Sequence, residues 1–284
     1  MLSEPKIGII GGSGLSGMNG IVDVEELDVE TPFGPTSDRI TIGSLADAKV
    51  AFLPRHGRGH HFSPTDIPVR ANIFALKKIG VERILSVSAV GSLKEDVHPL
   101  DMVVPDQLID RTRRRASTFF EGSIVAHISF SDPYCPGLSQ ELERAAQGQS
   151  VKLHMGGTYV VMEGPQFSTR AESNLYRSWG ASVIGMTALP EAKLAREAQM
   201  CYATLALVTD YDCWHETEEE VSVDIVVANM RKNVAASERI LKTVVSSIPN
   251  QRDCSCSKSL HNAIITDLAQ VPEETKRRLS VIMR

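Results

Sequence analysis

The sequence has few cysteines and no long apolar run. Five cysteines in 284 residues are an odd number spread over a long chain, which argues against a disulfide framework and favours a reducing compartment. The longest apolar runs, such as Met200 to Val208, fall far short of the roughly 18 residues that suggest a membrane span. Residues Met1 to Lys6 lack the basic and apolar pattern of a secretion signal. We therefore expect a cytoplasmic protein without a membrane partner.

An excess of positive charge is also absent. The chain carries 30 Lys and Arg against 35 Asp and Glu, a formal net charge of -5, so it lacks the broad cationic surface that binds nucleic acid. The hydrophobic content of 42% and charged content of 23% are ordinary for a globular protein. No shift in composition marks a linker, so we expect one domain over residues 1–284, with a helical tail from about residue 250.

Strand-length apolar runs alternate with amphipathic stretches, which is typical of an α/β fold. Predicted strands cover Lys6–Ile10, Arg39–Gly43, Lys49–Leu53, Arg83–Val90, Met102–Val104, Thr158–Met162 and Tyr202–Val208. Predicted helices cover Pro68–Ile79, Thr169–Trp179, Pro190–Gln199 and Ile225–Val245. We expect an α/β fold from this alternation.

A glycine-rich loop follows the first predicted strand. Gly12, Gly14 and Gly17 have the spacing of a dinucleotide-binding fingerprint, but the residues that follow do not predict the helix that such a fingerprint requires. The glycines could form a simple turn. Alternatively, exposed amides and the Ser13 hydroxyl could bind a small anion such as phosphate. An NAD-dependent oxidoreductase remains a remote alternative.

Two further strand ends carry groups that bind anions. Arg55 and His56 begin a loop rich in arginine, histidine and glycine, and a guanidinium there could hold phosphate in a bidentate manner. An idle surface loop is the alternative, and the absence of nearby Cys or carboxylate at ligand spacing gives no reason to expect a metal. Ser86 to Ser92 ends another strand in hydroxyls, which could equally be caps. Phosphate is the simplest ligand common to these loops.

Two carboxylates follow the strand that ends at Val208. Asp210 and Asp212 would point the same way if the strand continued, although such a pair often only caps the next segment. Burial and mutual repulsion would raise a carboxyl pKa toward neutrality, which suits proton transfer. Cys254 and Cys256 are too few for a zinc knuckle and have no partner pair in the sequence, so we expect a tail disulfide or an incidental thiol pair.

Taken together, the ordered motifs resemble the trimeric purine nucleoside phosphorylase family, most closely its branch acting on 5'-methylthioadenosine. The resemblance covers Lys6 to about Leu260. The segments that carry it are Gly11–Leu15, Thr31–Gly34, Arg55–Arg58, Arg70–Ile73, Glu163–Ser168, Gly185–Thr187 with Pro190–Glu191, and Thr209–Trp214. The resemblance implies a mixed-sheet α/β sandwich surrounded by helices and a homo-oligomer, either a trimer or a dimer of trimers.

The same resemblance assigns roles to individual positions. Phosphate would be held by Ser13, Arg55, His56, Ser88, Ala89 and Thr187. The nucleoside would be held by Phe167, Ser168, Met186, Asp210 and Asp212, with a 5' pocket at Val223, Val226 and Val227, and with His127 reaching in from a neighbouring subunit. Ser13 and Ser88 stand where the branch often has Thr, and Gly185 stands where an Asn is common in the animal enzymes.

The implied reaction is phosphorolysis of 5'-methylthioadenosine in purine and methionine salvage, with phosphate as nucleophile, Asp210 as the acid that reads the base and Asp212 assisting. It requires no metal or organic cofactor. One alternative is phosphorolysis of other purine nucleosides, namely adenosine, inosine, guanosine or methylthioinosine. Relatives that cleave 6-oxopurines typically have Glu at the position of Ser168 and Asn at that of Asp210. A nucleoside-binding module without turnover is a further alternative.

Overall fold

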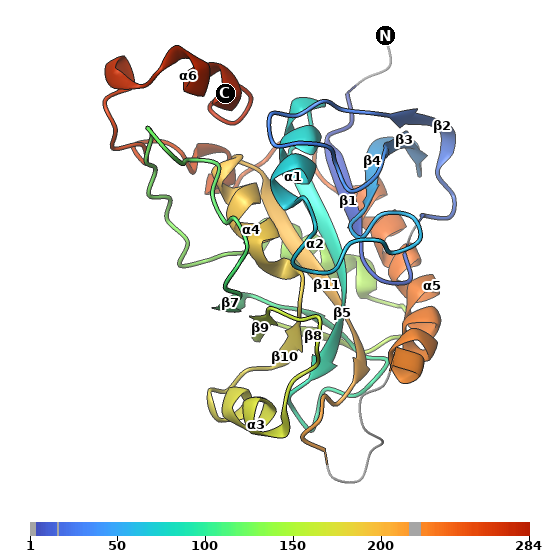
Figure 1. Ribbon diagram of the computed structural model, residues 1–284. Coiled ribbons are helices and arrows are strands. Elements are labelled where there is room, and N and C mark those ends of the chain that lie inside the picture. The colour runs from blue at the N-terminus through green and yellow to red at the C-terminus, as the bar shows by residue number, and fades with distance from the viewer. Residues whose placement is uncertain (1–3, 16, 216–222) are drawn as a thin grey trace.

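A mixed sheet of eleven strands runs through the centre of the computed structural model, which describes residues 4–15, 17–215 and 223–284 (Figure 1). The strands are β1 Ile7–Gly11, β2 Val22–Leu27, β3 Ile40–Leu45, β4 Ala48–Pro54, β5 Arg83–Ser92, β6 Met102–Val104, β7 Gln107–Arg111, β8 Leu153–Met155, β9 Thr158–Met162, β10 Val183–Gly185 and β11 Cys201–Asp210. The main path runs β2-β3-β4-β1-β5-β10-β9-β7, and β11, β6 and β8 branch from β5.

Strand β5 is the point at which the sheet divides. It pairs in parallel with β1 and β11, and its last residues pair antiparallel with β10. Its consecutive residues are nearly all buried, including Ser86 and Ser88, which is typical of a strand that is covered on both faces. Because β1, β4, β5 and β11 are mutually parallel, their carboxyl ends meet at one edge of the sheet. Gly11 lies beside Pro54 there, and Gly91 lies beside Asp210.

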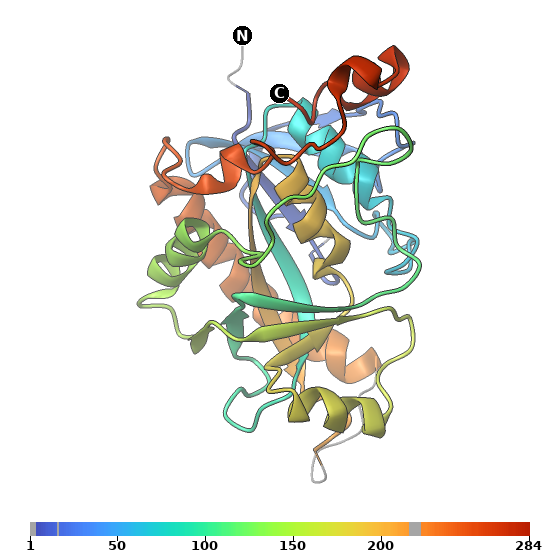
Figure 2. The same cartoon turned by 90° about the vertical axis from the view of Figure 1, so that its left-hand side faces the viewer.

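Helices cover both faces of β5 and β11 (Figure 2). The helices of the described residues are α1 Val69–Lys78, α2 Pro136–Ala146, α3 Arg170–Ser178, α4 Ala188–Glu197, α5 Val223–Ser247 and α6 Glu273–Leu279, with short 3-10 turns η1 Ser255–Lys258 and η2 Leu268–Gln270. Of these, α2, α4 and α5 pack on β5 or β11. One apolar core contains Ile73 of α1 and Leu194 of α4, and a second contains Leu142 of α2 and Leu241 of α5. A smaller third cluster includes Tyr176 of α3. This is the mixed-sheet α/β sandwich that the family resemblance implied.

The predicted helices and strands all exist, with small shifts at their ends. The first predicted helix is α1, which follows Pro68 and ends before Gly80, a residue with φ of +97°. The sequence patterns missed β2, β7, β8, β10 and α2. Strands β8 and β10 have only three residues each, which is too short for an alternating pattern to be recognised.

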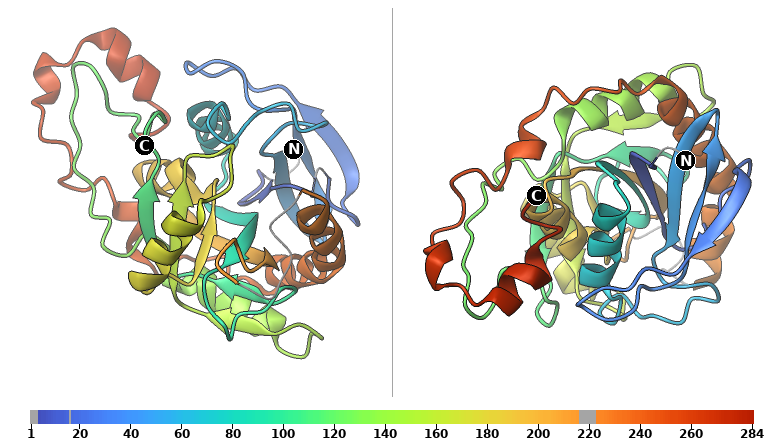
Figure 3. Two further views of the ribbon diagram at one scale, coloured as in Figure 1. Left: turned by 60° about the horizontal axis from the view of Figure 1, so that its bottom comes forward. Right: turned by 90° about the horizontal axis from the view of Figure 1, so that it is seen from above.

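The C-terminal tail follows α5 and packs against the long segment that precedes α2 (Figure 3). Ala126 and Ile264 form a β-bridge between the two segments. The tail contains the short elements η1, η2 and α6. Within the described residues, no helix combines the length and apolarity that would let it cross a bilayer.

Candidate active site

A cavity of about 700 Å³ opens at the edge where the parallel strands end. Its wall includes twelve of the predicted site residues, drawn from six strands or the loops that follow them and from α5. They are Ser13, Arg55, His56, Ser88, Ala89, Phe167, Met186, Thr187, Asp210, Asp212, Val226 and Val227. The parallel register of the sheet therefore brings together residues that lie up to about 200 positions apart in the sequence.

Hydroxyl groups gather at one end of this cavity. Ser88 Oγ and Thr187 Oγ1 lie 3.1 Å apart and share a hydrogen bond, and Ser13 contributes a third hydroxyl to the wall. Ser88 lies on β5, whereas Thr187 immediately precedes α4. Hydroxyls at a strand end and a helix start can donate to the oxygens of an anion without adding charge.

The guanidinium of Arg55 is fully buried and binds Glu191 of α4. Arg55 Nε donates to Glu191 Oε1 at 2.5 Å and Nη2 donates to Oε2 at 3.1 Å. Nη2 also donates to Ser86 Oγ at 2.6 Å, and Nη1 donates to the Val87 carbonyl at 2.9 Å. The bidentate interaction predicted for phosphate is thus made with Glu191. These contacts with described residues use four of the five guanidinium N–H groups and leave one, on Nη1, unpaired.

The glycine-rich loop makes room for this arginine. A Cβ on Gly12 would lie 2.7 Å from Arg55 Nη1 and 2.6 Å from the Val87 carbonyl oxygen, so only glycine fits. In the described residues between β1 and β2 no helix follows the loop. Gly12 therefore serves close packing around Arg55, whereas a Cβ on Gly14 would meet Met230 and one on Gly17 would meet nothing within 4 Å. The helix that a dinucleotide site needs is missing from this part of the structure.

His56 is held as a neutral ring. Burial lowers the pKa of His56 to about 4, and its Nδ1 lies 2.8 Å from the Phe62 carbonyl oxygen. A neutral imidazole whose Nδ1–H donates to that carbonyl has an unprotonated Nε2, which accepts hydrogen bonds. The ring of His60 stacks on His56 at 4.1 Å between centroids. His56 can therefore accept a hydrogen bond from a P–OH group of phosphate.

The buried ion pair yields a stability prediction. Arg55→Met leaves the Glu191 carboxylate buried without its cation and should lower the free energy of unfolding by about 3–5 kcal/mol. The double variant Arg55→Met/Glu191→Gln has no unpaired charge and should recover part of the loss. Urea unfolding followed by circular dichroism measures both. A loss below about 1 kcal/mol in the single variant would contradict the assignment.

Asp210 ends β11, lies in the wall of the same cavity and is 9% exposed. Its Oδ2 accepts from Thr209 Oγ1 at 2.6 Å and its Oδ1 accepts from the Asp212 amide at 2.8 Å. Burial raises the pKa of Asp210 to about 6. Each carboxyl oxygen has one internal partner, so each retains a second site that can face a ligand. Asp210 can hold or release a proton near neutral pH.

Asp212 stands beside Asp210 in a left-handed turn. Its φ of +52° is a conformation that Asp tolerates, and it swings the chain away from the strand. Burial also raises the pKa of Asp212. Asp212 Oδ2 is buried and makes no hydrogen bond to the described residues at ordinary distances, although the nearby Ser173 and Ser168 hydroxyls partly offset the rise in its pKa. An acceptor left unpaired in a cavity wall is suited to a donor on a ligand, such as an amino group.

The raised pKa of Asp210 predicts a pH-dependent stability. The native state keeps a proton that the unfolded chain releases between about pH 4 and 6, so stability falls as pH rises through this window. Above about pH 6, ionisation of the buried carboxyl lowers the free energy of unfolding by roughly 2–3 kcal/mol. Asp210→Asn removes the cost, because the oxygen of the introduced amide can accept from the Asp212 N–H while its NH₂ group donates to Thr209 Oγ1.

We expect Asp210→Asn to raise Tm by several degrees at pH 7.5, and we expect the difference to vanish below about pH 4. Differential scanning calorimetry across this pH range is the measurement. Asp28→Asn, on the exposed surface, is the matched control for removing one negative charge. An equal shift at every pH would contradict titration of Asp210 as its source.

Apolar side chains form another part of the cavity wall. Phe167 and Val227 are 42% and 40% exposed, which leaves their surfaces available to a ligand. Met186 is held by Arg115, whose Nη1 donates to the Met186 carbonyl at 2.5 Å. Val226 and Val227 come from the first turns of α5. The side chain of Val223 lies outside the described residues.

Two predicted site residues lie outside the cavity wall. Ser168 donates to Met162 Sδ at 3.4 Å, directly beside the wall residue Phe167. His127 is exposed on the segment before α2, and its amide donates to the Ala263 carbonyl at 2.8 Å. Within a single chain, His127 therefore belongs to the surface next to the tail.

The sequence reasoning missed the residues that support the site. Glu191 stood only as part of a motif, and Thr209 was not distinguished from its neighbours. The structure also explains why glycine occupies position 185. A Cβ there would lie 2.3 Å from Tyr159 Oη, so the buried phenol fills the space that a side chain at position 185 would need. Local sequence carries little signal for such contacts, since the partners are distant in the chain.

Comparison with known proteins identifies the family to which this chain belongs. The family model described as the phosphorylase superfamily matches residues 6–246. S-methyl-5'-thioadenosine phosphorylase of Geobacter sulfurreducens is 56% identical over 281 residues, covering 99% of this chain and 98% of the relative.

Solved structures agree with this result. A methylthioadenosine phosphorylase from an antarctic soil metagenomic library has a TM-score of 0.93 at 49% identity and covers 99% of both chains. Methylthioadenosine phosphorylase from Schistosoma mansoni, in complex with adenine, has a TM-score of 0.85 at 35% identity and covers 98% of both chains. The chain belongs to the phosphorylase superfamily and, within it, to the family of the S-methyl-5'-thioadenosine phosphorylases.

Proposed function

We propose that this protein catalyses the phosphorolysis of 5'-methylthioadenosine to adenine and 5-methylthioribose 1-phosphate, in purine and methionine salvage. The observation that supports this most is the composition of one cavity. A hydroxyl-lined end suits an anion, an apolar wall suits a methylthio group, and a buried carboxyl with a pKa of about 6 suits a purine. The full-length similarity to proteins named for this reaction supports the same conclusion.

Phosphate would bind at the end formed by Ser13, Ser88 and Thr187. The charge of Arg55 is already balanced by Glu191, so hydroxyls, the remaining Arg55 N–H and backbone amides would bind the anion. Cleavage of the N-glycosidic bond leaves positive charge on the sugar, and a phosphate beneath C1' stabilises that charge and then attacks. The carbon–nitrogen bond breaks, a carbon–oxygen bond to phosphate forms, and the purine leaves with the electron pair. This reaction requires neither a metal nor an organic cofactor.

Asp210 would supply the proton that the leaving purine needs. At pH 7 a carboxyl with a pKa of about 6 is protonated in roughly a tenth of the molecules, and a bound nucleoside would exclude water and raise this share. The protonated carboxyl can donate to N7 of the base. The unpaired Asp212 Oδ2 would accept from the 6-amino group, directly or through water.

The 5' substituent would lie against Val226 and Val227 at the start of α5. A methylthio group loses no hydrogen bond on an apolar wall, whereas a 5'-hydroxyl would be left without a partner. For the alternative of inosine or guanosine, a 6-oxopurine would meet Ser168 and Asp210 in place of a glutamate and an amide. The pattern of side chains favours a 6-aminopurine.

One assay separates the alternatives. The protein is incubated with 5'-methylthioadenosine with and without phosphate, and free adenine is measured. We expect adenine to be released only with phosphate. Release without phosphate would indicate a hydrolase, and binding without release would indicate a nucleoside-binding module. A shift of NADH fluorescence would instead support the oxidoreductase alternative.

Asp210→Asn tests the reading of the base. Loss of the proton donor should lower kcat/KM for 5'-methylthioadenosine about 10²- to 10⁴-fold. Methylthioinosine should lose much less, because the amide can donate to O6. Parallel kinetics on both nucleosides, with circular dichroism to confirm folding, provide the measurement. If the ratio between the substrates stays constant, Asp210 does not read the base and Asp212 becomes the residue to test.

Val227→Asp tests the 5' pocket. A carboxylate against the methylthio group should reduce kcat/KM for 5'-methylthioadenosine on the order of tenfold more than for adenosine, whose 5'-hydroxyl can hydrogen-bond to it. Ala228→Asp is the matched control, because Ala228 is exposed on the same helix turn and is not part of the cavity wall. Equal losses on both substrates would place the 5' pocket elsewhere.

We also propose that the protein is a cytoplasmic homo-oligomer, a trimer or a dimer of trimers, in which His127 reaches the site of a neighbouring subunit. The exposure of His127 on its own chain is compatible with such a contact. The five free cysteines are compatible with a reducing compartment. Analytical ultracentrifugation determines the oligomeric state.

A further inference from the structure

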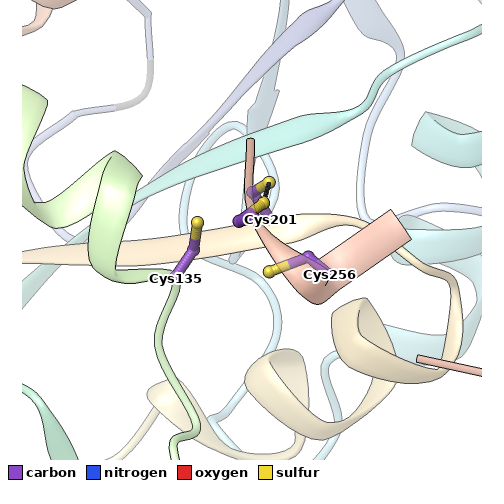
Figure 4. A group of neighbouring side chains, drawn as sticks. Cys135, Cys201 and Cys256 are labelled. Carbon is purple, nitrogen blue, oxygen red and sulfur yellow. Dashed lines mark hydrogen bonds between the residues drawn. The ribbon is translucent and has the colours of Figure 1, made fainter. Parts of the chain in front are cut away.

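Four of the five cysteines form one cluster at the edge of the sheet opposite the active site. Cys135 immediately precedes α2, Cys201 begins β11, and Cys254 and Cys256 lie at the start of η1 in the tail. Figure 4 shows Cys135, Cys201 and Cys256 converging from these three segments. The expectation that Cys254 and Cys256 lack a partner pair was wrong. Cys135 and Cys201 supply it from positions far away in the sequence.

The sulfur positions suit a tetrahedral metal ion. The four Sγ atoms all lie within 4.8 Å of one another, and Cys201 Sγ lies 3.3 Å from Cys254 Sγ. Zinc bound by four thiolates has Zn–S bonds of about 2.3 Å, which places the sulfurs of a regular tetrahedron about 3.8 Å apart. The observed spacing brackets this value. Small rotations about the Cα–Cβ bonds would therefore complete the coordination.

The cluster is buried, with one side open. Cys135, Cys201 and Cys256 are each 2% exposed, whereas Cys254 is half-buried and offers an entry path. The neighbouring core of α2 and α5 is apolar. Four closely packed cysteines sharing an apolar site form the donor set that selects zinc or iron among the common divalent ions.

The tail is positioned by contacts that do not involve the sulfurs. Arg83 Nη2 donates to the carbonyl oxygens of Pro249, Asn250 and Gln251 at 2.8, 3.2 and 3.0 Å. Arg252 Nη1 donates to the Gln199 carbonyl at 2.9 Å. These hydrogen bonds fix the chain just before Cys254. The position of the tail cysteines therefore does not depend on a bond between the cysteines.

We propose that Cys135, Cys201, Cys254 and Cys256 bind one Zn²⁺ ion that fastens the C-terminal tail to the body of the fold. Binding replaces the thiol protons by the metal ion and releases them to solvent, with no change of oxidation state. Cys201 and Asp210 lie at opposite ends of a ten-residue strand, roughly 30 Å apart. The ion is therefore structural and stands apart from the chemistry of the cavity.

Metal analysis of the full-length protein tests this proposal without reference to the proposed reaction. The protein is produced in medium supplemented with zinc, purified under reducing conditions without chelator, and analysed by plasma mass spectrometry. We expect about one zinc per chain in the wild type and loss of most of it in Cys135→Ser and Cys256→Ser. Cys213→Ser, at the one cysteine outside the cluster, is the matched control and should keep the metal.

Two wild-type measurements keep the test informative if the variants fail to fold. Cobalt in place of zinc should give the intense sulfur-to-metal absorption and visible bands of tetrahedral thiolate coordination. Removal of zinc by a chelator should lower Tm by about 5 °C or more, and zinc should restore it.

Other outcomes would overturn the proposal. Wild-type protein that has reactive thiols and takes up neither zinc nor cobalt would show an unliganded cluster. Mass spectrometry that finds the four cysteines in disulfides would show a covalent fastening instead. Iron at one equivalent per chain would overturn the choice of zinc. Because metal content is read independently of nucleoside cleavage, an inactive protein with one zinc would contradict only the proposed function.

Discussion

The ion pair between Arg55 and Glu191 is the interaction around which the active-site edge of the fold is built. It joins the end of β4 to α4 at a point where neither side chain is reached by water. Ser86 of β5 and Tyr202 of β11 complete the hydrogen bonding of the carboxylate. A buried charge pair is tolerated only when its remaining donors and acceptors are satisfied, and here four elements of the fold contribute to that.

This pairing determines how the cavity can bind an anion. Since Glu191 cancels the charge of Arg55, the hydroxyl end has little net positive potential, and His56 is neutral because it is buried. Recognition must rest on directional hydrogen bonds more than on long-range attraction. Such a site discriminates by geometry, which suits an enzyme that must leave its phosphate free to react.

Burial has a second consequence at the other end of the cavity. The same close packing that makes β11 wholly buried removes water from Asp210 and brings its pKa close to neutrality. Stability is lost at neutral pH in exchange for a carboxyl that can hold a proton where a base would lie. At the opposite end of β11, the cysteine cluster and the arginines that hold the tail occupy a separate region.

Much of the fold and of the site follows from sequence alone. Apolar runs at strand length and helical periodicity located most of the longer strands and helices. Twelve of the site residues implied by the family resemblance line one cavity, because many of them follow parallel strands whose carboxyl ends meet at one edge. Short strands such as β8 and β10 left no periodic pattern to detect.

Only the tertiary structure decided which partners the buried polar groups have. The sequence shows Arg55 but not that Glu191, 136 residues away, takes its bidentate contact. It shows Cys254 and Cys256 but not that Cys135 and Cys201 stand beside them. The physical reason is common to both cases: propensity and periodicity act between near neighbours in the chain, whereas ion pairs and sulfur clusters depend on distances that exist only once the sheet has assembled.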